Sequence, residues 1–239
     1  LQMGPPGTPD HLNISFYGTV VRVGDEFRMW YLALGEDNGV FGSRMAYAVS
    51  CDGLNWEKPS LGLTSFDGST ANNLVEINSA HNAELSAILV LHDPDDPDPN
   101  RRFKLISEVS PFYNIAAFSP DGLRWTESPH NPILKHNTLE PGGIMKFNGV
   151  YYLTGQGGNV GSKRALVTYM SYDFDHWTEG VVVGLRRDRP PYHQLSGPHA
   201  GEQVHLGASL WNRGNIILGL YGQWHGESND RAFVSMDLG

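Results

Sequence analysis

A seven-residue segment that recurs three times limits what this chain can fold into. It reads Ser-x-Asp-Gly-Leu-x-Trp at residues 50–56 and 119–125, and residues 171–177 repeat its serine, aspartate and tryptophan. The tryptophans stand at positions 56, 125 and 177, so successive copies are 69 and 52 residues apart. Such intervals suit the four short strands and loops of a propeller blade, and the longer one contains the proline and aspartate run at residues 93–100. The spacing therefore predicts repeated four-stranded β-blades.

The residue types in the segment are those of a tight turn. An aspartate accepts hydrogen bonds from backbone N–H groups two residues further on, and a glycine or aspartate tolerates the left-handed conformation. The tryptophan is expected to pack between adjacent blades. We interpret the repeat as structural.

Short β-branched or aromatic runs precede the first turn, at residues 18–23, 27–34 and 44–50, and no segment has a helical stripe. The sequence predicts an all-β, single-domain β-propeller over residues 1–239, with about four blades. Their predicted ranges are 16–59, 84–130, 139–183 and, incomplete, 204–239. The last blade lacks its closing turn and a propeller closes into a ring. We therefore expect either that the chain is a piece of a longer protein or that a second copy, in a homo-oligomer, completes the ring.

Two runs read as loops. The proline and aspartate run at residues 93–100 is incompatible with a strand interior and predicts a hairpin loop. The glycine-rich run at residues 155–161 lies between strands and precedes no helix, so it does not predict a phosphate cradle. We expect a flexible loop at the mouth of a funnel.

Composition excludes several partners. The formal net charge of -9 argues against nucleic acid, because phosphate binding needs clustered Lys and Arg. The single cysteine, Cys51, excludes an internal disulfide. Neither an apolar run of about 18 residues nor a signal peptide is evident, so no membrane partner is expected and the compartment stays open.

Residues 140–153, Glu-Pro-Gly-Gly-Ile-Met-Lys-Phe-Asn-Gly-Val-Tyr-Tyr-Leu, resemble the general-acid segment of glycoside hydrolase family 43. The Asp-Gly-Leu-x-Trp turns resemble those of the five-bladed propeller glycosidases of families 32, 43 and 68 and of the phosphorylases of family 130. The chain is also similar to bacterial propeller proteins related to the family 32 N-terminal domain, which share the run at 93–99. The resemblance implies a five-bladed glycosidase propeller with carboxylates at the starts of the innermost strands.

Three glutamates precede expected innermost strands: Glu84 in blade two, Glu140 in blade three and Glu202 in blade four. The resemblance implies that Glu140 is the general acid. Hydrolysis also needs a second carboxylate. Residues 11–24 of blade one contain no acid, so the candidates for the base are Glu202, Glu84 and Asp10. Retention and inversion of configuration both stay open.

The expected activity is hydrolysis of a neutral oligosaccharide or glycoside that carries arabinosyl, xylosyl, galactosyl or fructosyl units. One alternative is a propeller that binds carbohydrate without cutting it. Others are a glycoside phosphorylase, for which Arg164, Arg186 or Arg189 would hold phosphate, and a sialidase-like enzyme. A sialidase needs arginines spread across blades to clamp a carboxylate, and the arginines here are clustered.

Candidate substrate-binding residues are His199 and His205, which flank Glu202 in sequence, and the aromatic residues Tyr113 and Trp224. The six-residue histidine spacing is poor for zinc, so we expect no catalytic metal and no cofactor. A structural calcium in the hub is left open by analogy.

Overall fold

The structure is a computed structural model of the 239-residue chain, which divides into two compact units, Leu1–Ile133 and Leu134–Gly239. It describes residues 1–78, 85–109, 113–134, 139–160, 163–182, 203–225 and 233–238. Within these ranges, only the backbone is described for residues 158–160, 163–164, 182, 203–206, 223–225 and 233–238.

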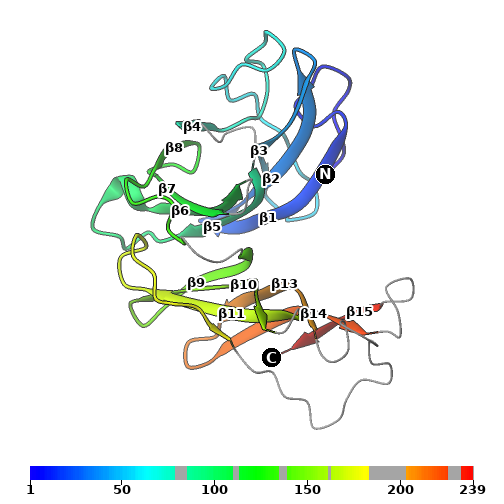
Figure 1. Ribbon diagram of the computed structural model, residues 1–239. Helices are drawn as coiled ribbons and strands as arrows, with labels where there is room; N and C mark the ends of the chain where they lie inside the picture. The colour runs from blue at the N-terminus through cyan, green and yellow to red at the C-terminus, as the bar shows by residue number, and fades with distance from the viewer. Residues whose placement is uncertain are drawn as a thin grey trace. The chain divides into compact units, whose positions relative to one another are not determined.

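Both units are built from β-sheets, and the described residues contain no α-helix (Figure 1). This confirms the predicted all-β class. One three-residue 3-10 helix, η1 (Pro99–Arg101), interrupts a loop. No helix in the described part of the chain is long and apolar enough to cross a membrane.

The first unit contains two sheets that lie face to face. The strands of the first, in the order β1-β2-β3, are β1 (Asn13–Val23), β2 (Glu26–Asp37) and β3 (Val40–Ser50). Those of the second, in the order β4-β8-β7-β6-β5, are β4 (Glu76–Asn78), β5 (Leu85–His92), β6 (Phe103–Val109), β7 (Tyr113–Ser119) and β8 (Arg124–Glu127). Successive strands within each sheet are antiparallel, except that β4 joins the outer edge parallel to β8.

The second unit also contains two sheets. The strands of the first, in the order β12-β11-β10-β9, are β9 (Glu140–Phe147), β10 (Val150–Val160), β11 (Lys163–Ser171) and β12 (Val181–Val182). Those of the second are β13 (Gln203–Asn212), β14 (Ile217–His225) and β15 (Phe233–Leu238). All their pairings are antiparallel.

Residues 155–160 of the glycine-rich run form part of a strand. Residues 155–157 pair with β9 on one side and with β11 on the other, and β10 continues to Val160. The prediction of a loop is wrong for residues 155–160, which lie within β10. Here Gly155 allows a close approach, since a Cβ on it would lie 2.4 Å from the Glu140 carbonyl oxygen.

The predicted hydrogen bonds to the turn aspartate are confirmed in all three copies. In the first, Asp52 Oδ1 accepts hydrogen bonds from the N–H groups of Leu54 at 2.8 Å and Asn55 at 2.7 Å. The indole of Trp56 donates to the Gly53 carbonyl oxygen at 3.2 Å. The second and third turns repeat these bonds at 2.8–3.1 Å. Each copy therefore closes its sheet in the same way.

The third turn departs from one expectation. The prediction of glycine or aspartate at the left-handed position is wrong there, because Phe174 occupies it with φ 70°. A non-glycine residue in this conformation costs about 1–2 kcal/mol. Phe174 is fully buried, with ring centroids 5.2 Å from Tyr151 and 5.4 Å from Trp177. Aromatic packing therefore offsets the backbone strain.

The turn aspartates link stability to pH. The N–H and side-chain amide of Asn55, with the N–H of Leu54, hold the pKa of Asp52 well below its usual range. The folded state thus favours the ionised form of Asp52. This carboxylate therefore adds to the free energy of unfolding above about pH 4, and its contribution is lost as the pH falls. We expect Asp52→Asn to flatten the dependence of the unfolding temperature on pH between about 2 and 5. Identical pH profiles for variant and wild type would contradict this expectation.

The two sheets of the first unit share one hydrophobic core. Trp30 in β2 is fully buried between Tyr47 and Phe103, with ring centroids 5.5 and 5.9 Å away. Its indole donates a hydrogen bond to the Gly122 carbonyl oxygen at 2.7 Å, and Trp125 donates to the same oxygen at 3.0 Å. The second turn is therefore attached to the neighbouring sheet by a buried hydrogen bond.

Gly122→Ala is expected to cost about 2–4 kcal/mol of the free energy of unfolding. The residue has φ 81°, and a Cβ would lie 2.6 Å from Cζ2 of Trp30. Gly53 is a matched control, because it has φ 74° at the same turn position but its nearest neighbour is the Phe27 ring at 3.7 Å. Gly53→Ala should cost only about 1–2 kcal/mol. Equal losses in denaturant titrations would disprove the role of the Trp30 contact.

The proline and aspartate run forms the predicted hairpin loop between β5 and β6. Lys104, a fully buried residue of β6, contacts Asp96 at 2.5 Å and Asp93 at 3.7 Å. Its ammonium also donates to the Arg101 carbonyl oxygen at 2.5 Å. Burial lowers the pKa of Lys104, and the hydrogen bond with Asp96 opposes that shift. The acidic loop is thus held by an internal lysine.

Candidate functional site

Glu140, the predicted general acid, is the first residue of β9 and is partly buried. The register of the hairpin places it opposite Gln156 in β10. Gln156 Nε2 donates a hydrogen bond to Glu140 Oε2 at 3.0 Å. The preceding residue, Leu139, is fully buried and anchors the start of the strand.

Each of the four described sheets contains a run of antiparallel strands joined in sequence order. The first strand of each run (β1, β5, β9 and β13) has a register shift near its start. The shifts lie between Ser15 and Thr19 in β1, between Leu85 and Ala87 in β5, at Gly142 in β9, and between His205 and Ala208 in β13. Bulges change the direction of nearby side chains and are frequent beside active sites. The strand starts, where the sequence predicts carboxylates, are therefore irregular.

The other two predicted glutamates lie outside the described residues. Glu84 immediately precedes β5 and Glu202 immediately precedes β13, so both sit in sequence at first-strand starts. His199 also lies outside the described residues, and for His205 in β13 and Trp224 in β14 the structure gives the backbone alone. The predicted roles of all five stay predictions.

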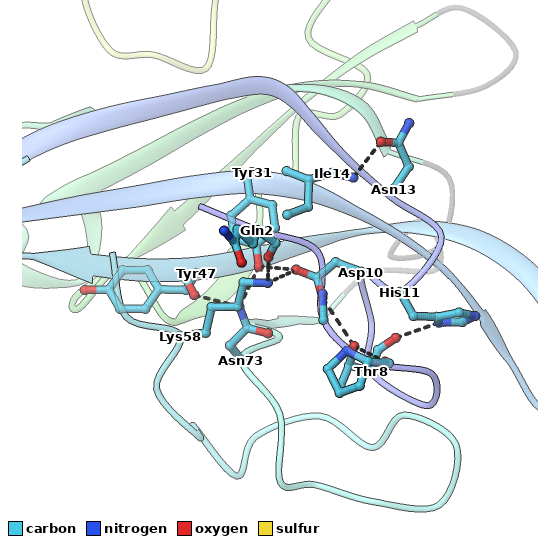
Figure 2. Close-up of polar contacts among 12 residues, drawn as sticks. Gln2, Thr8, Asp10, His11, Asn13, Ile14, Tyr31, Tyr47, Lys58 and Asn73 are labelled. Atoms are coloured by element: carbon cyan, nitrogen blue, oxygen red, sulfur yellow. Dashed lines mark hydrogen bonds and ion pairs between the residues drawn. The ribbon is translucent and has the colours of Figure 1, made fainter. Parts of the chain in front are cut away.

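Asp10 lies three residues before β1 and is 1% exposed. Its carboxylate accepts hydrogen bonds from the Tyr31 hydroxyl at 2.9 Å and the Gly4 N–H at 3.2 Å, and it forms an ion pair with Lys58. Figure 2 shows the Tyr31 hydroxyl and the Lys58 ammonium directed at the Asp10 carboxylate. Asp10 thus joins the N-terminal segment to β2 and to the segment after the first turn.

The hydrogen-bond network continues beyond Asp10. Asn73 donates from its amide to the Tyr31 hydroxyl and to the Tyr47 carbonyl oxygen, both at 2.8 Å. Burial, and then the charge of Asp10, raise the pKa of Tyr31 far above its usual range. Tyr31 therefore serves as a neutral hydrogen-bond bridge in this network.

A cavity of about 210 Å³ adjoins Asp10, Lys58 and Asn73. The Asp10 carboxylate that adjoins it is already bound by Tyr31 and Lys58, and the Asn73 amide is bound to Tyr31. We therefore regard this network as structural.

The aromatic residues divide by burial. Trp30 and Tyr31 are fully buried in the core of the first unit. Tyr113 begins β7 and is partly buried against the core of the first unit. Trp211 is 58% exposed in β13, with the Arg213 guanidinium 4.5 Å from its ring centroid. The role of Tyr113 in substrate binding stays a prediction.

Among the residues that the structure describes, no group of three or more His, Cys, Asp or Glu side chains could hold a metal ion. The absence of a catalytic metal and of a cofactor stays a prediction. The question of a structural calcium in the hub stays open.

The sequence does not predict two of the residues at these sites, Gln156 and Lys58. Gln156 was assigned to a loop, and its contact with Glu140 depends on a bulge that shifts the register by one residue. Lys58 lies 48 residues from Asp10, and no local pattern links them. Both contacts are products of the tertiary structure.

No known protein family has a sequence profile that matches this chain, and no curated protein sequence matches it. Solved structures do match. A glycosyl hydrolase from Bacteroides ovatus has 16% sequence identity and a TM-score of 0.55, over 95% of this chain and 65% of that one. An alpha-L-arabinofuranosidase from Clostridium thermocellum has 11% identity and a TM-score of 0.59, over 95% and 68%. The beta-fructofuranosidase of Bombyx mori, from glycoside hydrolase family 32, has 17% identity and a TM-score of 0.52, over 91% and 44%.

This chain shares its fold with glycosidase β-propellers. The resemblance seen in the sequence is thereby confirmed at the level of fold. The chain spans 65% of the length of the Bacteroides ovatus protein and 44% of the Bombyx mori enzyme. Because one fold hosts many activities, the shared fold identifies an architecture and leaves the reaction to be argued from the site.

Proposed function

We propose that this chain is a glycoside hydrolase for neutral oligosaccharides or glycosides with arabinosyl, xylosyl, galactosyl or fructosyl units, and that Glu140 is its general acid. The observation that carries the proposal is the position of Glu140. It is the first residue of β9, beside a bulge, in a chain that shares its fold with glycosidases. The resemblance to family 43 implies a general acid at this type of position, the start of an innermost strand.

The reaction needs two carboxyl groups. Glu140 gives its proton to the leaving oxygen as the bond from that oxygen to the anomeric carbon breaks. In the inverting form, the second carboxylate takes a proton from the water that adds to that carbon. In the retaining form, it attacks the carbon first and water later releases it.

Glu84 and Glu202 are the stronger candidates for the second carboxylate, because each immediately precedes a first strand. Asp10 is already committed to Tyr31 and Lys58 and is 1% exposed. Catalysis by Asp10 would require that ion pair to break, which carries a substantial cost for a buried carboxylate.

The proposed architecture is a propeller of about four visible blades around a central funnel, completed by further residues of a longer protein or by a second copy of the chain. The repeated turns and the four sheets support the blades. In this arrangement the first strands, with their bulged starts, would surround the funnel.

The second candidate is a carbohydrate-binding propeller without hydrolytic activity. Two observations favour it: residues 11–24 contain no Asp or Glu, and the nearest acid, Asp10, is held in a buried ion pair. Such a protein would keep Glu140 as a hydrogen-bonding residue for sugar hydroxyls.

A substrate panel tests both candidates. Nitrophenyl arabinosides, xylosides and galactosides, together with sucrose, are incubated with the protein, with and without inorganic phosphate, and products are separated by chromatography. We expect free sugar to be released without phosphate. Release of a sugar phosphate would indicate the phosphorylase instead. Binding on a glycan array without product would favour the second candidate, and neither binding nor product would overturn both.

A further inference from the structure

We infer that Gln156 is a positioning residue for Glu140, one that orients the carboxyl group for proton transfer to the leaving oxygen. This inference rests on the proposed function. It assigns to Gln156 a role that follows from its contact with Glu140 rather than from any contact with substrate.

Neighbouring groups pack closely against the backbone at Glu140. Leu139 is fully buried on one side, and Gly155 approaches so closely that a Cβ would lie 2.4 Å from the Glu140 carbonyl oxygen. The side chain, in contrast, has three rotatable bonds, which a partly buried position does not restrict by itself. A directional contact is needed to hold the carboxyl group in one orientation.

Gln156 supplies that contact. Its Nε2 donates to Glu140 Oε2 at 3.0 Å, from the directly opposite position in the neighbouring strand. The described residues place no hydrogen-bond partner on Oε1. The carboxyl group is thereby held through one oxygen, and the other remains available to carry the proton to substrate. An amide suits this role because it donates a hydrogen bond and carries no charge.

The test uses the leaving group of the substrate. Phenyl glycosides need a proton on the departing oxygen, whereas dinitrophenyl glycosides leave with little protonation. With the sugar that the wild type hydrolyses, Gln156→Met should lower kcat for the phenyl glycoside about tenfold and change kcat for the dinitrophenyl glycoside much less. Gln156→Asn, whose amide is one methylene too short for the contact, should give the same pattern.

Thr154→Val is the matched control. Thr154 lies in the same strand, and its hydroxyl donates to the Ala208 carbonyl oxygen at 2.7 Å, a contact with no link to Glu140. Its effect on activity should be equal for both leaving groups. Thermal unfolding of each variant establishes that it is folded.

The possible outcomes separate the two proposals. Equal losses on both glycosides, or no loss, in folded Gln156→Met and Gln156→Asn overturn the positioning role and leave the hydrolase intact. If both Gln156 variants fail to fold, Gln156 is a structural residue and the inference is overturned. Absence of hydrolysis by the wild type overturns the proposed function and this inference together.

Discussion

Glu140→Gln is expected to lower kcat for phenyl glycosides by about 10²–10⁴-fold, the usual contribution of a positioned general acid. Glutamine has nearly the same shape but has no acidic proton to give to the leaving oxygen. KM should change little, because the amide still makes hydrogen bonds. Steady-state kinetics with the sugar chosen by the substrate panel measures both quantities.

Glu179→Gln is the control for this prediction. Glu179 is an exposed residue of the same unit, outside any strand, so its replacement removes the same charge without touching the site. It should leave kcat unchanged. Full activity of Glu140→Gln, with an unfolding temperature equal to that of the wild type, would rule out Glu140 as the acid.

Lys104→Met is expected to cost about 3–5 kcal/mol of the free energy of unfolding, the range for removing one partner of a buried ion pair. Lys104 is fully buried, and Asp93 and Asp96 have side-chain exposures of 4% and 11%. Methionine fills much of the same volume but leaves two buried carboxylates without this cation. Urea titration followed by tryptophan fluorescence measures the loss.

Lys104→Met combined with Asp96→Asn separates charge from packing. The second substitution removes one carboxylate that the lysine had neutralised, so the double variant should recover part of the lost stability. A loss below about 1 kcal/mol for Lys104→Met alone would show that the ion pairs contribute little.

The all-β class and the repeated turns were predictable because they depend on local chemistry that repeats. An aspartate that accepts two N–H bonds and a tryptophan that donates to a carbonyl oxygen form the same turn wherever they occur. The departures arose where tertiary packing overrode local preference. Phe174 takes a left-handed conformation because its ring is buried, and Gly155 lies within a strand because another backbone approaches it.

The site was less predictable. The sequence indicated that glutamates stand at first-strand starts, and the structure puts Glu140 at the start of β9. The sequence did not indicate which of the candidate acids are already bound in ion pairs or hydrogen bonds. Asp10 was a candidate base by sequence proximity, but its ion pair with Lys58 bridges 48 residues and has no local pattern.

The sequence by itself determined the repeated turns and the all-β class, because both follow from contacts between residues a few positions apart. The tertiary structure decided how the turns connect and which residue faces Glu140. The indole of Trp30 reaches the second turn across 92 residues, a contact that exists only when two sheets pack. The turn at Asn148 and Gly149 sets Phe147 opposite Val150, and regular pairing would then place residue 157 opposite Glu140. A one-residue bulge, formed only in the folded sheet, places Gln156 there instead.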